Sequence, residues 1–258
     1  MERGKMNYRV NAVTCRGERW SSNQDSLYVK HGVLEGEEFI MAIVCDGMGG
    51  ICNGRYASSE VVKTFSSWSD HCLPEIVRDE LLPEIANQWK ELLQQLNHRF
   101  MGKGVEQGVT TGTTFTAMFF HHSHYLIMHI GNSGIYRITD KVELLTTDHT
   151  VTGEKIRKGQ LTPEEGKHDR GRTMLLQCIG ASSEICPEII YGKTEPGIYC
   201  LCTDGLRNRS TEELFLEYFS PEKNRTEHEL KTQAHGIMED LSERGEDDNM
   251  SVILILAQ

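Results

Sequence analysis

The 258-residue chain has 38% hydrophobic and 25% charged residues, the composition of a folded protein with a sizeable core, which excludes an intrinsically disordered chain. Its formal net charge of -11 disfavours a nucleic acid as the main partner, because phosphate backbones bind basic surfaces. No segment approaches the roughly 18 consecutive apolar residues of a membrane span, and the N-terminus lacks the apolar stretch of a signal peptide. We therefore expect a cytoplasmic monomer that binds neither nucleic acid nor membrane.

The eight cysteines are expected to be reduced. None belongs to a CxxC pair. Cys45, Cys200 and Cys202 lie in strand-like runs, where a thiol acts as a small hydrophobic side chain. Buried thiols therefore explain these cysteines better than disulfides do.

The first half of the chain predicts strands followed by helices. Apolar runs with β-branched residues, separated by turn-rich or charged segments, indicate strands at 8–13, 26–31 and 39–45. Apolar residues then recur every three or four positions, which predicts amphipathic helices over 56–68 and 76–100. Pro83 is expected to start or kink the second helix.

The second half alternates strands, a polar excursion and further helices. β-Branched and aromatic residues between 112 and 148 predict a meander of four short antiparallel strands, with the run HHSH at a hairpin turn. The polar segment 150–171 is predicted to carry two short helices, the second capped by Thr162 and Glu165. The remaining elements are strands near 189, at 198–203 and at 251–257, and helices at 212–219 and 227–243. Because no repeat or linker divides the chain, residues 1–258 are predicted to form one α+β domain.

Acidic residues stand at the ends of four predicted strands. Asp46 ends the apolar run in MAIVCDGMGG, Asp204 ends that in LCTDGL, Asp248 precedes the last strand in EDDNMSVILIL, and Asp25 precedes a strand in SSNQDSL. If these strands are neighbours, the carboxylates converge, repel one another and lose hydration, which requires a cation. A set of oxygen ligands favours a hard ion such as Mg2+ or Mn2+. Taken singly, each Asp-Gly motif is more often a plain turn.

Eight motifs in order resemble the metal-dependent protein phosphatases of type 2C, the PPM family, in their compact bacterial form. They are RWSSNQDS, VCDGMGG, TTGTTFTA, HIGNSGIYRI, TTDHT, LLQCIG, LCTDGL and DDNMSVI. The match runs from about residue 11 to residue 256. The resemblance implies a four-layer α-β-β-α sandwich, with two antiparallel sheets flanked by helices and an active site at one end between the sheets.

The resemblance also implies the residues of a site for two Mn2+ or Mg2+ ions. Asp46 would bridge the ions, the Gly47 carbonyl would bind one of them, and Asp204 and Asp248 would hold the other. Asp25 would act through metal-bound water, so that Asp46, Asp204 and Asp25 are the implied catalytic residues. A hydroxide shared by the ions would attack the phosphate in line, without a phosphoenzyme. The implied partners are phosphorylated proteins, with a serine/threonine kinase among them.

Three positions depart from the family pattern. The phosphate-binding arginine usually stands where this chain has Trp20, so Arg19 becomes the candidate, with a surface role as its alternative. The motif GDSR is here GNSG, and Asn132 makes a third ion doubtful, although it is equally suited to a plain turn. Met48 replaces a histidine of animal relatives, as it commonly does in bacterial ones.

The segment 150–172 corresponds to the flap of the family, a mobile segment beside the active site. Its basic residues form either a rim that attracts phosphorylated segments or merely a solvated loop. They are Lys155, Arg157, Lys158, Lys167, Arg170 and Arg172. His149, just before the flap, is assigned a local structural role.

The predicted function is that of a metal-dependent phosphatase acting on phosphoserine and phosphothreonine in proteins. The alternative is a low-activity or regulatory binding module of the same fold, which Asn132, Gly134 and the displaced Arg19 motivate. Hydrolysis of small phosphorylated molecules is a third possibility.

Overall fold

The computed structural model describes residues 6–34, 36–48, 53–76 and 81–258. Gly49 and Gly50 of the first motif therefore lie outside the described residues. Two five-stranded antiparallel sheets form the centre. The first sheet has the order β1 (Tyr8–Cys15), β12 (Met250–Ala257), β11 (Gly197–Cys202), β8 (Gly134–Ile138) and β9 (Val142–Leu144). The second has the order β10 (Glu188–Lys193), β7 (His124–Ile130), β6 (Phe115–His121), β3 (Glu37–Cys45) and β2 (Ser26–Leu34).

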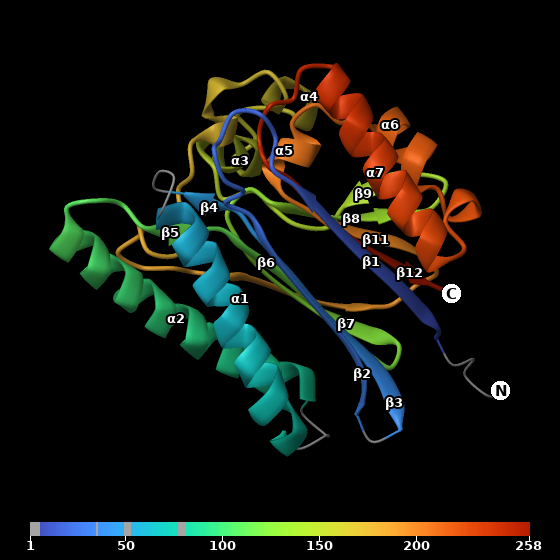
Figure 1. Ribbon diagram of the computed structural model, residues 1–258, viewed down its shortest axis with the longest axis horizontal. Coiled ribbons are helices and arrows are strands. Elements are labelled where there is room, and N and C mark those ends of the chain that lie inside the picture. Colours follow the sequence, from blue (N-terminus) through green and yellow to red (C-terminus); the bar gives the residue numbers. More distant parts are fainter. Residues whose placement is uncertain (1–5, 35, 49–52, 77–80) are drawn as a thin grey trace.

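Helices cover the outer face of each sheet (Figure 1). The pair α1 (Asn53–His71) and α2 (Leu81–Gln107) packs on the second sheet, and the pair α6 (Glu212–Phe219) and α7 (Glu227–Glu243) packs on the first. None of the described helices is long and apolar enough to cross a membrane. The layer order is therefore α-β-β-α, as the sequence resemblance implied.

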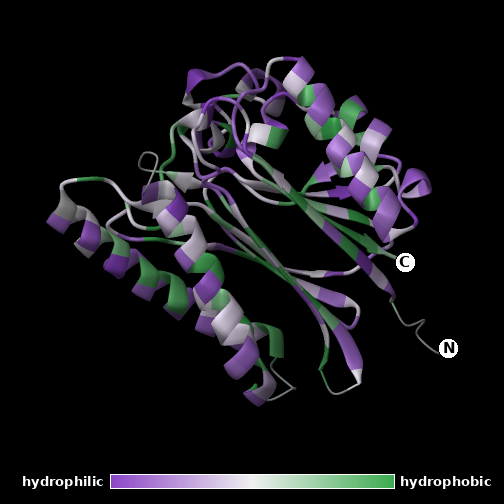
Figure 2. Cartoon of the chain, in the orientation of Figure 1, coloured by the Kyte–Doolittle hydropathy of each residue, from purple (hydrophilic) through white to green (hydrophobic). Residues whose placement is uncertain are grey.

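Alternation along the strands produces three apolar layers. In β3, Met41 and Ile43 point towards α1 and α2, whereas Ile40 and Ala42 point between the sheets, because successive side chains of a strand face opposite ways. The strands inside are accordingly rich in hydrophobic residues, and both helical layers mix hydrophobic with hydrophilic ones (Figure 2). This double-sided burial explains why β3 and β12 are nearly continuous apolar runs in the sequence.

The predicted meander between 112 and 148 is wrong. β6 and β7 form a hairpin in the second sheet, but β8 and β9 belong to the first sheet. The chain changes sheets at the turn after β7, where Gly131 has φ +116°, a conformation that favours glycine. The HHSH run lies at the β6–β7 turn, as predicted.

Most other boundaries agree with the sequence. α6 and α7 have the predicted bounds, and a capping box of Thr162 and Glu165 starts α4 (Pro163–Gly166). The helix expected from residue 76 begins instead at Leu81, with Pro83 in its first turn. A short 3-10 helix, Leu73–Glu75, precedes it.

Trp89 is the centre of the layer between α1, α2 and the second sheet. It is fully buried and packs edge-on against Phe65, Trp68 and Phe115, with ring centroids 5.6, 5.8 and 6.2 Å away. Its indole N–H has no hydrogen-bond partner.

Trp89→Ala is expected to lower the free energy of unfolding by about 3–5 kcal/mol, because it leaves a cavity among aromatic rings. Trp89→Phe is the matched control, since it keeps a ring and removes the unpaired N–H; it should lose much less. Urea unfolding of both variants measures the difference. Equal losses would contradict the role assigned to the ring.

Candidate active site

Four aspartates meet at one end of the two sheets, each from a different strand end. Asp46 directly follows β3 and Asp25 directly precedes β2, and these strands are neighbours in the second sheet. Asp204 follows β11 and Asp248 lies just before β12, neighbours in the first sheet. The carboxyl groups of Asp46 and Asp204 lie within hydrogen-bonding distance of each other. The structure thus brings together the aspartates that the sequence singled out.

Close backbone contacts hold these strand ends together. A Cβ at Gly47 would lie 2.2 Å from the carbonyl oxygen of Gly54 in α1, and one at Gly205 would lie 2.1 Å from the carbonyl oxygen of Asn249. Neither position has room for a side chain. The glycine after Asp46 and the glycine after Asp204 are therefore required for packing at the site.

Asp25 ties the two sheets to each other. Its Oδ2 accepts hydrogen bonds from Thr203 Oγ1 at 2.9 Å and from Ser251 Oγ at 2.7 Å. Thr203 immediately precedes Asp204, and Ser251 lies in β12. A carboxylate of the second sheet is thus held by hydroxyls of the first.

Burial and the charges of neighbouring aspartates raise the pKa values of Asp25, Asp46 and Asp204. Burial raises the pKa of Asp25 to about 7, although the hydroxyls of Ser251 and Thr203 act against this rise. Burial, and then the charges of Asp204, Asp25 and Asp248, raise the pKa of Asp46 well above its usual range. The pKa of Asp204 is raised by burial and by the charge of Asp248. A nearby cation would therefore favour the ionised form of each of these three carboxyl groups near neutral pH.

The donor set fits a hard divalent cation. The aspartates offer carboxylate oxygens, which Mg2+ and Mn2+ prefer, and Asp46 and Asp204 remain partly accessible to solvent. Among the described residues, no group of three or more histidine, cysteine, aspartate or glutamate side chains is arranged closely enough to hold a metal ion. The assignment of ligands therefore relies on the pairwise contacts and on the raised pKa values.

Arg19 lies at the edge of this cluster. Its Nη1 donates to Asp248 Oδ2 at 3.2 Å, its guanidinium lies 5.0 Å from the Trp20 ring centroid, and 54% of its side chain is exposed. Trp20 Nε1 donates to the other oxygen of Asp248 at 2.8 Å. This contact was not predicted from the sequence, where Trp20 was considered only as the residue at the position of the family's arginine. The indole N–H, which usually finds a hydrogen-bond acceptor, could have indicated it.

Asn132 is both a turn residue and a neighbour of the carboxylates. It follows Gly131 in the turn that joins the sheets, and its Nδ2 donates to Asp204 Oδ2 at 2.9 Å. Its Oδ1 is buried without a hydrogen-bond partner. The structure therefore places Asn132 at a turn, as one alternative had it, and also beside Asp204.

The flap consists of α3 (Val151–Arg157), α4 and a 3-10 helix, Arg170–Thr173. Most of its basic residues are paired with carboxylates of the flap itself. The pairs are Lys155–Asp169 at 2.7 Å, Arg157–Glu154 at 2.7 Å, Lys158–Glu154 at 3.1 Å and Lys167–Glu164 at 2.7 Å. These pairs favour the solvated-loop interpretation over a basic rim.

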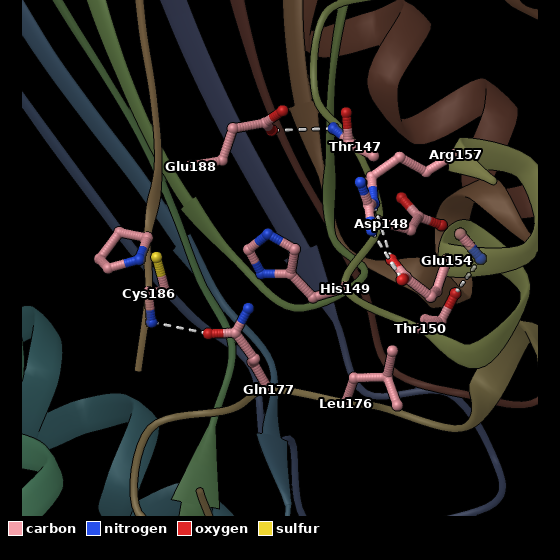
Figure 3. A pocket seen from close by; sticks show the side chains of 12 residues that line it. Thr147, Asp148, His149, Thr150, Glu154, Arg157, Leu176, Gln177, Cys186 and Glu188 are labelled. Atoms are coloured by element: carbon pink, nitrogen blue, oxygen red, sulfur yellow. Dashed lines mark hydrogen bonds and ion pairs between the residues drawn. The ribbon is translucent and has the colours of Figure 1, made fainter. Parts of the chain in front are cut away.

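A pocket of about 320 Å³ lies at the base of the flap (Figure 3). The ring of His149 faces this pocket, together with Gln177 and Cys186. The His149 backbone N–H donates to the Gly131 carbonyl at 2.7 Å, and the His149 carbonyl accepts from Leu176 N at 2.8 Å. His149 therefore joins the turn, the flap and the following segment, in keeping with the structural role expected of it.

This fold is that of a type 2C phosphatase. A family model described as "Protein phosphatase 2C" matches residues 18–241, and the chain belongs to this family. Protein phosphatase PhpP of Streptococcus pneumoniae is 30% identical over 203 residues, which cover 77% of this chain and 79% of that protein.

Solved structures agree with this membership. The S. agalactiae serine/threonine phosphatase superposes with a TM-score of 0.82 at 25% identity, covering 97% of this chain and 99% of that one. The catalytic domain of PstP in complex with 2 manganese ions has a TM-score of 0.76 at 23% identity, covering 98% and 99% of the two chains. The latter likeness concerns the fold alone.

His129 supports the turn that carries Asn132. The ring is fully buried, and its neighbours assign the tautomer: Nδ1 accepts from Thr116 Oγ1 at 2.8 Å and Nε2 donates to the Gly131 carbonyl at 3.1 Å. Burial lowers the pKa of His129 to about 3, and the charges of His149 and Arg207 act in the same direction.

The folded-state pKa of His129 lies below its ordinary value of 6.5, so its contribution to stability is complete above pH 6.5 and is lost as the pH falls towards 3. Between pH 7.5 and pH 5 this loss amounts to about 2 kcal/mol. His129→Gln lacks the titrating group. Between pH 7.5 and pH 5, its free energy of unfolding should therefore fall by about 2 kcal/mol less than that of the parent. Urea unfolding at both pH values tests it; an identical pH dependence would contradict the buried neutral histidine.

Proposed function

We propose that this chain is a metal-dependent phosphatase that hydrolyses phosphoserine and phosphothreonine in proteins. The convergence of Asp25, Asp46, Asp204 and Asp248 carries the proposal. Nothing in the fold requires four acidic groups at one place, and the raised pKa values of Asp25, Asp46 and Asp204 make the cluster unfavourable without a cation. Family membership and relatives named as phosphatases support turnover, and no comparison favours a binding module without activity.

The proposed ligands are those that the resemblance assigned. Asp46 and the Gly47 carbonyl, with Asp204 and Asp248, would hold two Mn2+ or Mg2+ ions, and the PstP structure with 2 manganese ions supports this number. When bound, such ions lower the pKa of water and offset charge on the phosphate oxygens. Asp25, held by two hydroxyls, keeps a fixed orientation beside Asp46 and Asp204.

Arg19 is the proposed phosphate-binding residue. Its ion pair with Asp248 is half exposed, and such pairs contribute little, about 0–1 kcal/mol. Exchange of this carboxylate for a phosphate therefore costs little. The guanidinium can donate two parallel hydrogen bonds to a phosphate, which suits an incoming phosphoserine or phosphothreonine.

Phosphorylated proteins, a serine/threonine kinase and its substrates are the proposed partners, and the cytoplasm is the proposed location. The described cysteines support a reducing compartment, since all seven of them have free thiols. The proposed functional unit is a single domain, because the site draws its residues from both sheets.

Purified protein is expected to hydrolyse p-nitrophenyl phosphate and a phosphothreonine peptide with Mn2+ or Mg2+, and not with EDTA. Asp204→Asn should lower kcat by about 100-fold or more, because it removes a carboxylate from the metal site. Asp140→Asn is the matched control, since Asp140 is exposed in the turn between β8 and β9; it should retain the parent rate.

Thermal unfolding separates the remaining outcomes. Mn2+ should raise the melting temperature of the parent and of Asp140→Asn, and should raise that of Asp204→Asn much less. Undiminished turnover in Asp204→Asn would contradict the assigned ligands. Mn2+ binding without any turnover in the parent would favour the regulatory module instead.

A further inference from the structure

Arg207, the last residue of α5 (Asp204–Arg207), has its guanidinium inside the protein rather than in solvent. Only 13% of the side chain is exposed. Nε donates to Tyr136 Oη at 3.0 Å, and Nη1 donates to the Asn132 carbonyl at 2.5 Å and to Asp148 Oδ1 at 2.8 Å. A charge that is buried to this extent needs hydrogen-bond acceptors and a counter-charge to offset its lost hydration.

The guanidinium of Arg207 packs closely against the backbone of Gly134. A Cβ at Gly134 would lie 3.1 Å from Arg207 Cζ and 3.2 Å from Arg207 Nε. Residue 134 is also the position at which the family motif GDSR has its arginine, whereas this chain has GNSG. The chain thus lacks an arginine at 134 and places the guanidinium of Arg207 against the same backbone position.

The contacts of Arg207 join three separate parts of the site. Arg207 is on the helix that begins with Asp204, and it holds the carbonyl of Asn132, whose side-chain amide donates to Asp204. Its third partner, Asp148, lies two residues before the flap cap Thr150. One side chain therefore spans the Asp204 helix, the sheet-joining turn and the base of the flap.

We propose that Arg207 is a positioning residue for Asp204 and that residues 134 and 207 form a reciprocal pair, in which either one, but not both, supplies the guanidinium. The inference rests on the proposed function, because it concerns the orientation of a proposed metal ligand. A planar group with several donors is needed to serve Tyr136, Asn132 and Asp148 together, and an ammonium group does not match this geometry.

The first experiment compares Arg207→Met and Arg207→Lys with the parent. Calorimetric titration with Mn2+ should give a 10–100-fold weaker Kd for Arg207→Met, the range typical of residues that orient metal ligands. With p-nitrophenyl phosphate, kcat should fall by a similar factor while KM changes little, since Arg207 is proposed to act through Asn132 and Asp204. The Mn2+ Kd and the kcat of Arg207→Lys should lie between those of the parent and those of Arg207→Met.

Arg244→Met is the matched control. Arg244 lies at the exposed C-terminal end of α7, paired with Asp240 at 2.8 Å, and it contacts none of the proposed ligands. It should keep the parent Kd and kcat. Circular dichroism checks that every variant is folded, and Arg207→Lys retains the charge if Arg207→Met does not fold.

The second experiment tests reciprocity. Gly134→Arg alone should weaken Mn2+ binding, because two guanidinium groups then compete for one space. Adding Arg207→Ala should restore Mn2+ affinity above that of either single variant. Gly134 lies in β8 and has no positive φ that would exclude another residue.

Two results would overturn the proposal: a folded Arg207→Met with the parent Mn2+ affinity, or a double variant whose Mn2+ affinity does not exceed that of both single variants. These results differ from a failure of the proposed function. In that case the parent itself would show no metal-dependent turnover. The Mn2+ titration does not depend on turnover and tests Arg207 either way.

Discussion

Repulsion among the aspartates at the ends of β3, β11, β12 and β2 is the constraint on which the rest of the site depends. Burial makes ionisation of Asp25, Asp46 and Asp204 unfavourable, and the charge of Asp248 raises the pKa of all three further. The protein offsets this with neutral donors: hydroxyls on Asp25, an amide on Asp204 and an indole N–H on Asp248. Such donors fix the orientation of the carboxylates without neutralising them, which leaves their charge for a cation.

The two-sheet architecture supplies the geometry that this cluster needs. Each sheet contributes two neighbouring strand ends, and the apolar layer between the sheets fixes the distance between the pairs. Packing of that density resists displacement. The glycines that follow Asp46 and Asp204 then allow backbone contact where the sheets end. Stability and function are therefore connected, since a change in the middle layer would move two carboxylates relative to the other two.

The acidic cluster was predictable because each aspartate interrupts an apolar run, a signal that needs no knowledge of the fold. Element types and most boundaries were predictable for a similar reason, from periodicity and from caps such as Thr162. The meander was not, because strand patterns do not say which sheet a strand joins. Gly131 was the available clue, and it marks a turn without specifying that the chain crosses between sheets.

Contacts made by residues far apart in the sequence were the least predictable part of the site. Arg207 and Asn132 are separated by 75 positions, and nothing in LCTDGLRNRS indicates that its arginine turns inwards. The loss of an arginine at Gly134 was visible, but it read as degeneration. In the structure, the Arg207 guanidinium lies against Gly134 and has three partners, which supports the proposed exchange.

Asn132 completes this reasoning about charge. An aspartate there would place a further negative charge beside Asp204, whose pKa is already raised by Asp248. The amide removes that repulsion and donates a hydrogen bond, so it stabilises the ionised form of Asp204. The same change withdraws a charge that a third cation would use. The departures at 132 and 134 therefore act on one carboxylate, and they are more consistent with an altered active site than with a lost one.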